Sequence, residues 1–127
     1  MNIPADTKKV LVTATFGPAN PERCPGAFVF AQEAAKAGAE VSLVFVLQAP
    51  LLLKKGVAEK LHAKEGGRSI REFIDDTLQA GVQFYICDTA MDLCDMTADD
   101  LIEEIELLVG PSFVITEGFQ ADLVLTY

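Results

Sequence analysis

The sequence predicts an α/β protein: a three-layer α/β/α sandwich built on a five-stranded, mostly parallel sheet. Strand-length apolar segments alternate with segments of helical spacing, and glycines follow two of the predicted helices. The first strand, helix, glycine and second strand follow one another as in a βαβ unit, whose crossover should be right-handed. A chain of 127 residues is long enough for one sizeable core, so we expect a single domain over residues 1–127.

The first βαβ unit covers residues 8–47. Residues 8–16 (KKVLVTATF) are β-branched and mostly apolar, as expected for a strand that is covered on both faces. After a loop of turn formers, a helix is predicted from Pro25, which suits the first helical position, to about Ala37. Residues 40–47 (EVSLVFVL) form the second buried strand.

The next helix has the clearest start signal in the chain. Residues 48–68 are irregular, and Ser69 and Glu72 then stand at the spacing of a capping box. Apolar residues recur at helical spacing up to Gly81, which suits the end of a helix. Residues 82–86 (VQFYI) are the third strand, and Cys87 stands at its carboxyl end.

The last third of the chain allows two interpretations. Residues 97–100 (TADD) form a second capping signature, so a helix should begin there. If that helix continued to Val109 with a strand at 112–116, only six residues would remain before the last strand. A parallel crossover needs about a dozen residues, although an antiparallel hairpin would still be possible. We therefore prefer a fourth strand at 105–109, a helix from Pro111 to about Gln120 and a last strand at 123–127.

Composition excludes several classes of function. The net charge is −9, and no lysine or arginine cluster exceeds the pairs 8–9 and 54–55, so neither nucleic acid nor an anionic lipid surface is expected as a partner. The apolar runs are far shorter than the roughly 20 residues of a membrane span, and residues 1–6 do not read as a signal peptide. We expect a cytoplasmic protein whose three cysteines form no disulfide framework.

All three cysteines fall in loops predicted at the carboxyl ends of strands, where parallel sheets gather their functional groups. Cys87 directly follows a buried strand and is the strongest candidate for chemistry, although a packed structural cysteine remains the alternative. A reactive thiol needs a lowered pKa, and the aspartates of residues 88–95 act against this. The helix start near Thr97 and the lysines Lys54 and Lys55 are the groups available to offset them.

The other two cysteines are candidate auxiliaries. Cys24 precedes Pro25 at the expected N-cap of the first helix, where the helix dipole and Arg23 would favour a thiolate. Cys94 lies seven residues after Cys87 and could resolve an oxidised Cys87 as a disulfide, or simply be a loop thiol.

Other kinds of site are poorly supported. His62 is the single histidine and is expected on the surface, and no C-x-x-C motif suggests a zinc site or a dithiol. Residues 13–18 take the place of a phosphate loop but have neither glycine-rich signature. The acidic run 103–106 is interpreted as a solvated helix end. We expect no cofactor and no metal.

Four segments in the same order resemble the DsrE/DsrF-like family, which includes the Dsr and Tus sulfur-relay subunits and YchN-like proteins. They are KVLVTATFGPANPERC, LLLKKGVAEKL, GVQFYICDTAMDLCDMTADDLIEE and VGPSFVITEGFQADLVLTY. Together they cover nearly the whole chain, and the resemblance also places the fourth strand before Gly110. The residues after Cys87 depart from the relay subunits, which carry small residues and a basic pair there.

The resemblance implies a persulfide carrier of the sulfurtransferase type, with the functional cysteine at Cys87. It also implies homotrimers or hexamers, with sulfur-donor and sulfur-acceptor proteins as partners. A non-catalytic oligomeric module that binds a small ligand or a partner is the alternative, and a redox sensor using Cys87 and Cys94 is a third hypothesis.

Overall fold

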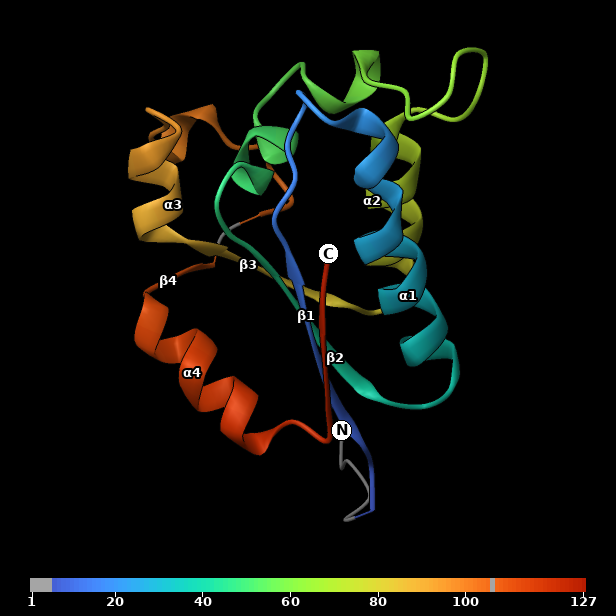
Figure 1. The fold of residues 1–127 in the computed structure, drawn as a ribbon, viewed down its shortest axis with the longest axis vertical. Coiled ribbons are helices and arrows are strands. Elements are labelled where there is room, and N and C mark those ends of the chain that lie inside the picture. The colour runs from blue at the N-terminus through green and yellow to red at the C-terminus, as the bar shows by residue number, and fades with distance from the viewer. Residues whose placement is uncertain (1–5, 106) are drawn as a thin grey trace.

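A single five-stranded sheet organises the protein in a computed structural model that describes residues 6–105 and 107–127 (Figure 1). Its order is β4-β3-β2-β1-β5, and every neighbouring pair is parallel. The predicted α/β class and the mostly parallel sheet are therefore confirmed. The strands are β1 (Lys9–Ala14), β2 (Glu40–Phe45), β3 (Gln83–Cys87), β4 (Leu108–Val109) and β5 (Leu123–Thr126).

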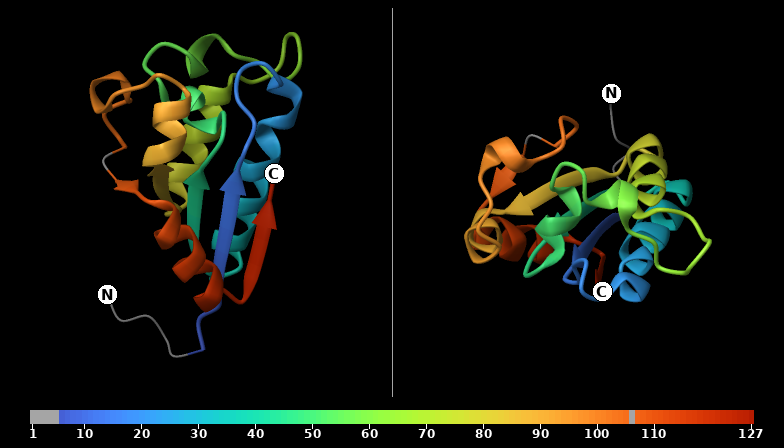
Figure 2. Two further views of the ribbon diagram at one scale, coloured as in Figure 1. Left: turned by 60° about the vertical axis from the view of Figure 1, so that its left-hand side comes forward. Right: turned by 90° about the horizontal axis from the view of Figure 1, so that it is seen from above.

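Four α-helices cover the two faces of this sheet. Figures 1 and 2 show α1 and α2 on one face and α3 and α4 on the other, which confirms the three-layer sandwich. In the part of the chain that the structure describes, no helix is long and apolar enough to cross a bilayer. The helices are α1 (Pro25–Lys36), α2 (Ile70–Gln79), α3 (Asp88–Leu93) and α4 (Pro111–Gln120).

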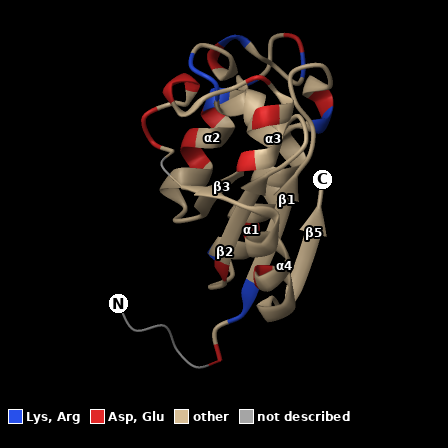
Figure 3. Ribbon diagram, turned by 90° about the vertical axis from the view of Figure 1, so that its left-hand side faces the viewer, with Lys and Arg blue, Asp and Glu red and all other residues tan. Residues whose placement is uncertain are grey.

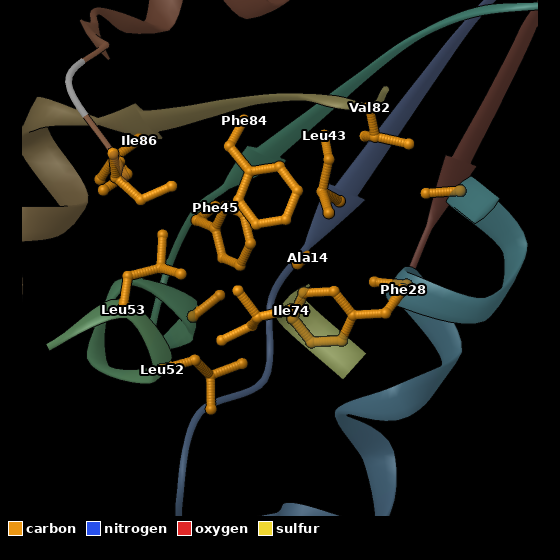
Figure 4. Packing of buried hydrophobic residues seen from close by; sticks show 14 of the residues in the cluster. Ala14, Phe28, Leu43, Phe45, Leu52, Leu53, Ile74, Val82, Phe84 and Ile86 are labelled. Atoms are coloured by element: carbon orange, nitrogen blue, oxygen red, sulfur yellow. The ribbon is translucent and has the colours of Figure 1, made fainter. Parts of the chain in front are cut away.

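The main core lies between the sheet and the layer of α1 and α2. Alternate residues of β1, β2 and β3 point into it, as the two-residue period of a strand requires. Phe28 of α1 meets Phe45 and Phe84, with ring centroids 5.2–6.4 Å apart across the three pairs (Figure 4). Leu52 and Leu53, from a 3₁₀ helix after β2, close the carboxyl end of this core.

The opposite face of the sheet is covered more thinly. Tyr85 of β3 packs against Phe113 of α4 with ring centroids 4.6 Å apart, and Gly118 lies near the side chain of Leu11. None of the residues of α4 is fully buried. Because side chains alternate along a strand, Cys87 lies on the same face as Tyr85 and therefore on the side of α3 and α4.

Two local predictions hold. Ser69 caps α2 as expected: its hydroxyl accepts from the amide of Glu72, and the Glu72 carboxylate accepts from the amide of Ser69. The fourth strand precedes Gly110 and a helix begins at Pro111, as preferred, although β4 is only two residues long. Two predictions fall partly on residues that the structure does not describe. Glu106 belongs to the predicted fourth strand and to the predicted acidic helix end, and residues 1–5 belong to the segment in which no signal peptide was expected.

The helix between β3 and β4 was predicted in the wrong place. It begins at Asp88, immediately after Cys87, in a segment interpreted as a polar loop. The capping signature at Thr97 is present, since its amide donates to the Asp100 carboxylate at 2.8 Å, but only the 3₁₀ helix Ala98–Asp100 follows. The chain then turns inward because the apolar side chains of Leu101, Ile102 and Ile105 enter the core.

Candidate functional site

Cys87 is the last residue of β3 and also the N-cap residue of α3, so it stands where a strand passes directly into a helix. The residue is buried, with 5% of its surface exposed. Its Sγ lies 3.1 Å from the hydroxyl of Thr89. The prediction that Cys87 reaches the carboxyl edge of the sheet is confirmed, and what it does there is a separate question.

A cleft opens over Cys87 between α3 and α4. Its volume is about 320 Å³, and Cys87 and Thr89 contribute its reactive and hydroxyl side chains. The cysteine is thus buried at the base of an open cleft and is not sealed inside the core. Apolar residues from the end of β2, from α3 and from α4 form the walls: Val46, Leu47, Ala90, Leu93, Pro111, Val114 and Ile115.

Leu47 adopts an unusual backbone conformation at the edge of this cleft. Its φ is +53°, in the left-handed region that a bulky residue such as leucine rarely occupies. Such strain costs about 1–3 kcal/mol, and it persists only where the surrounding structure enforces it, often at functional sites. Here it leaves the Leu47 side chain more than half exposed beside the cleft.

Cys94 anchors the same turn. Its thiol donates to the carbonyl oxygen of Leu47 at 3.3 Å, and burial, followed by the charge of Asp95, raises its pKa. Cys94 therefore holds the loop after β2 against the end of α3. Because the Cys94 thiol donates its proton to this carbonyl, Cys94 is poorly suited to act as the thiolate that resolves an oxidised Cys87.

Cys24 has a different environment from the one that the sequence suggested. It does occupy the N-cap position of α1, but the predicted stabilisation of a thiolate there is wrong. Burial raises the pKa of Cys24 to about 11, and the charge of Glu22 acts in the same direction. Its Sγ lies 3.4–3.7 Å from the carbonyl oxygens of Phe16, Gly17 and Asn20, which accept its proton.

The cations expected to offset the aspartates interact with another element. The Lys55 ammonium donates to the carbonyl oxygen of Asp99 at 3.0 Å. The pKa of Asp100 is lowered, first by the amide of Thr97 and further by the charges of Lys54 and Lys55. Both lysines thus interact with the turn at 98–100. The structure therefore does not support the prediction that they offset the aspartates near Cys87.

The remaining candidates do not join the cleft. His62 is exposed, as predicted, with its Nδ1 3.0 Å from the carbonyl oxygen of Gly67. Within residues 6–105 and 107–127, no three His, Cys, Asp or Glu side chains are grouped closely enough to hold a metal ion.

Sequence reasoning missed Thr89 and the wall formed by α4. Thr89 was seen as a loop residue, although Asp88 in a first helical turn is a recognisable start signal. The α4 wall could be anticipated only in part, since residues 113–115 (FVI) favour a strand and become helical after Pro111.

The fold and this cleft define a class: parallel α/β/α proteins that present a cysteine at the carboxyl edge of the third strand. The chain belongs to the DsrE/DsrF-like family, whose sequence profile matches residues 8–124. This membership confirms the resemblance and supports a protein of the sulfur-relay type.

Two solved structures share the fold. The ychN protein from E. coli has a TM-score of 0.78 at 18% identity, covering 95% of this chain and 100% of that one. MTH1491 from Methanobacterium thermoautotrophicum, described as a protein of unknown function, has a TM-score of 0.64 at 12% identity, covering 96% and 100%. A search of curated protein sequences gave no match.

Proposed function

We propose that this protein carries sulfane sulfur as a persulfide on Cys87 and so acts as a sulfur-relay protein or sulfurtransferase. One observation carries the proposal: Cys87 stands at the base of an open cleft, beside a hydroxyl group, in a chain of the DsrE/DsrF-like family. Cys24 and Cys94 donate their thiol protons to backbone carbonyl oxygens, whereas Cys87 lies beside the Thr89 hydroxyl in the cleft, which favours Cys87 as the carrier.

The chemistry needs only sulfur exchange. The Cys87 thiolate attacks the terminal sulfur of a donor hydropersulfide, so that a new S–S bond forms, the donor S–S bond breaks and the donor leaves as a thiolate. An acceptor thiolate then attacks the outer sulfur of the Cys87 persulfide and releases Cys87 as a thiolate. No external oxidant or reductant is consumed, and the Thr89 hydroxyl can donate a hydrogen bond to the sulfur anion.

Intact-protein mass spectrometry tests this proposal. After incubation with excess polysulfide and removal of the donor, the mass should rise by about 32 Da for each sulfur carried. The gain should disappear in Cys87→Ser and persist in Cys24→Ser and Cys94→Ser. If Cys24→Ser abolishes the gain and Cys87→Ser does not, the assignment of the carrier residue is wrong.

The redox-sensor hypothesis gives a different mass. A disulfide between Cys87 and Cys94 would lower the mass by about 2 Da on mild oxidation, and Cys94→Ser would abolish that loss. The hydrogen bond from the Cys94 thiol to the Leu47 carbonyl favours the carrier over this alternative, because it holds Cys94 against another group.

The carrier would work as an oligomer. Figure 3 faces the side of α3 and α4, where charged residues gather around α3 and the loops above it, whereas α4 and β5 are almost free of them. Phe119 of α4 is 85% exposed, and Val124, whose side chain lies on the α4 face of β5, is 49% exposed. Such a patch suits contacts between subunits, and native mass spectrometry should show homotrimers or hexamers.

Donor and acceptor proteins complete the relay. The net charge of −9 favours partners that offer a basic face, and neither nucleic acid nor a membrane surface meets that condition. Free thiols persist in a reducing compartment, so the cytoplasm is the expected location.

A second function competes with this one. A non-catalytic module of the same fold would bind a small ligand or a partner in the cleft, with Cys87 merely packed, and the 5% exposure of Cys87 favours it. The two functions differ in thiol reactivity. A packed Cys87 reacts with iodoacetamide no faster than Cys24, the buried thiol of the same chain, whereas a carrier thiol reacts many times faster.

A further inference from the structure

A second cleft adjoins the one over Cys87. Its volume is about 510 Å³, and it lies between the loop at residues 15–20 and the turn after β2. The two chain segments approach closely there, since a Cβ on Gly17 would lie only 2.5 Å from the Gln48 carbonyl oxygen. Leu47 and Leu93 line both clefts.

Leu47 and Leu93 therefore form a shared apolar ridge between the two clefts. Both side chains are more than half exposed, Leu47 at 55% and Leu93 at 59%. Exposing a leucine side chain to water is unfavourable in free energy, and a ligand lying across the ridge would remove both side chains from water.

Charge around the ridge discriminates between ligands. The Cys87 cleft has apolar walls, and Asp88, Asp92 and Asp95 follow one another along and just after α3. Lys54 and Lys55, the basic pair of the neighbouring loop, interact with the turn at 98–100. The negative charge repels an anion that approaches this cleft, whereas it does not repel an uncharged apolar molecule.

We infer that, besides sulfur-donor proteins, Cys87 accepts sulfur from an uncharged, apolar sulfane-sulfur compound of low molecular weight. Its sulfur chain would lie at Cys87, and its organic group would cross the ridge of Leu47 and Leu93 into the second cleft. This inference rests on the proposed function, because it names the class of donor that Cys87 accepts.

A dialkyl trisulfide, RSSSR, represents this class. The Cys87 thiolate attacks the central sulfur, forming Cys87–S–S–S–R and releasing RS⁻ as one S–S bond breaks. That thiolate then attacks the sulfur bearing R, which forms the disulfide RSSR and leaves Cys87 as the persulfide anion. Four sulfur atoms and one negative charge are conserved, and no further reactant is needed.

The test compares two donors that share one reactive group. Diallyl trisulfide is apolar and uncharged, whereas glutathione trisulfide is anionic. The rate of Cys87 modification is followed by mass spectrometry in the Cys94→Ser protein and divided by the rate of a short unstructured cysteine peptide. The normalised ratio is the peptide-corrected rate with diallyl trisulfide divided by the corrected rate with glutathione trisulfide, and it should be about ten or more. Longer alkyl groups should add up to about fourfold per buried methylene.

Exposed positions allow charge to be placed in the clefts without disturbing the core. Leu93→Lys should lower the preference for the apolar donor by about tenfold, and Leu93→Gln should leave most of it. Ile115→Lys, on the opposite wall and 58% exposed, should act in the same direction. Val29→Lys is the control, because Val29 is an exposed residue of α1, on the opposite face of the sheet (Figure 1).

The outcomes separate the two claims. A normalised ratio near one would overturn the donor class and leave the carrier intact. A ratio that Leu93→Lys changes no more than Val29→Lys does would have the same meaning. If neither the two trisulfides nor polysulfide modify Cys87 in the folded protein while all three modify the urea-unfolded chain, the proposed function fails together with this inference.

Discussion

Cys24 should make the protein less stable at high pH, and the size of the effect follows from its surroundings. The thiol is 3% exposed and surrounded by backbone carbonyl oxygens. Burial raises its pKa from the ordinary value of 9.0 to about 11. Because the native state holds the proton more tightly than the unfolded state, the contribution is complete below pH 9 and is lost as the pH rises to 11.

The magnitude follows from the shift in pKa. Each pKa unit corresponds to 1.36 kcal/mol, so the free energy of unfolding should fall by about 2–3 kcal/mol between pH 9 and pH 11. Tyrosines and lysines titrate in the same range, and a matched variant is therefore required. Cys24→Ala loses the packing of the sulfur at every pH but has no proton to lose.

Urea denaturation of both proteins at pH 8, 9, 10 and 11 measures the effect. The stability difference between the native sequence and Cys24→Ala should shrink by about 2–3 kcal/mol over this range. A difference that stays constant from pH 8 to pH 11 would refute the reasoning and show that Cys24 titrates as an ordinary thiol.

Three further predictions concern the scaffold and the remaining thiol. Ser69→Ala removes the α2 cap and should lower the free energy of unfolding by about 1 kcal/mol in urea, and an unchanged midpoint would contradict the capping geometry. Phe28→Ala leaves a cavity beside the rings of Phe45 and Phe84 and should cost about 3–5 kcal/mol, whereas Val29→Ala beside it on the exposed side should cost under about 1 kcal/mol. Iodoacetamide at pH 8 should label Cys94 faster than Cys24, because Cys94 is only partly buried, and peptide mapping would reveal the reverse order.

The fold was predictable wherever local signals agree with packing. Ser69 and Glu72 mark a helix start that needs no tertiary information, and the β-branched, apolar segments of β1 and β2 favour strands. The segment after Cys87 was harder to predict. Its helix is one short stretch of six residues, and Thr97 carries a stronger start signal that leads only to a 3₁₀ turn. The chain does not continue as an α-helix there because Leu101 packs into the core, and the spacing of apolar residues in the sequence does not reveal that contact.

The site was predictable in position and much less in environment. The carboxyl end of β3 could be assigned to Cys87 from the order of strands. The sequence could not show that Cys24 is buried among carbonyl groups, because its neighbours Arg23 and Pro25 suggest an exposed helix start. Nor could it show that residues from α4, far along the chain, complete the wall of the cleft.

The central claim is that Cys87 accepts and holds a sulfur atom in the folded protein. Tandem mass spectrometry of the polysulfide-treated protein, after the reactive sulfur is capped by alkylation, locates that atom directly. The account predicts an additional sulfur of about 32 Da on the peptide that contains Cys87, sensitive to reductant and absent in Cys87→Ser. A persulfide found only on Cys24 or Cys94, with Cys87 unmodified, would contradict it.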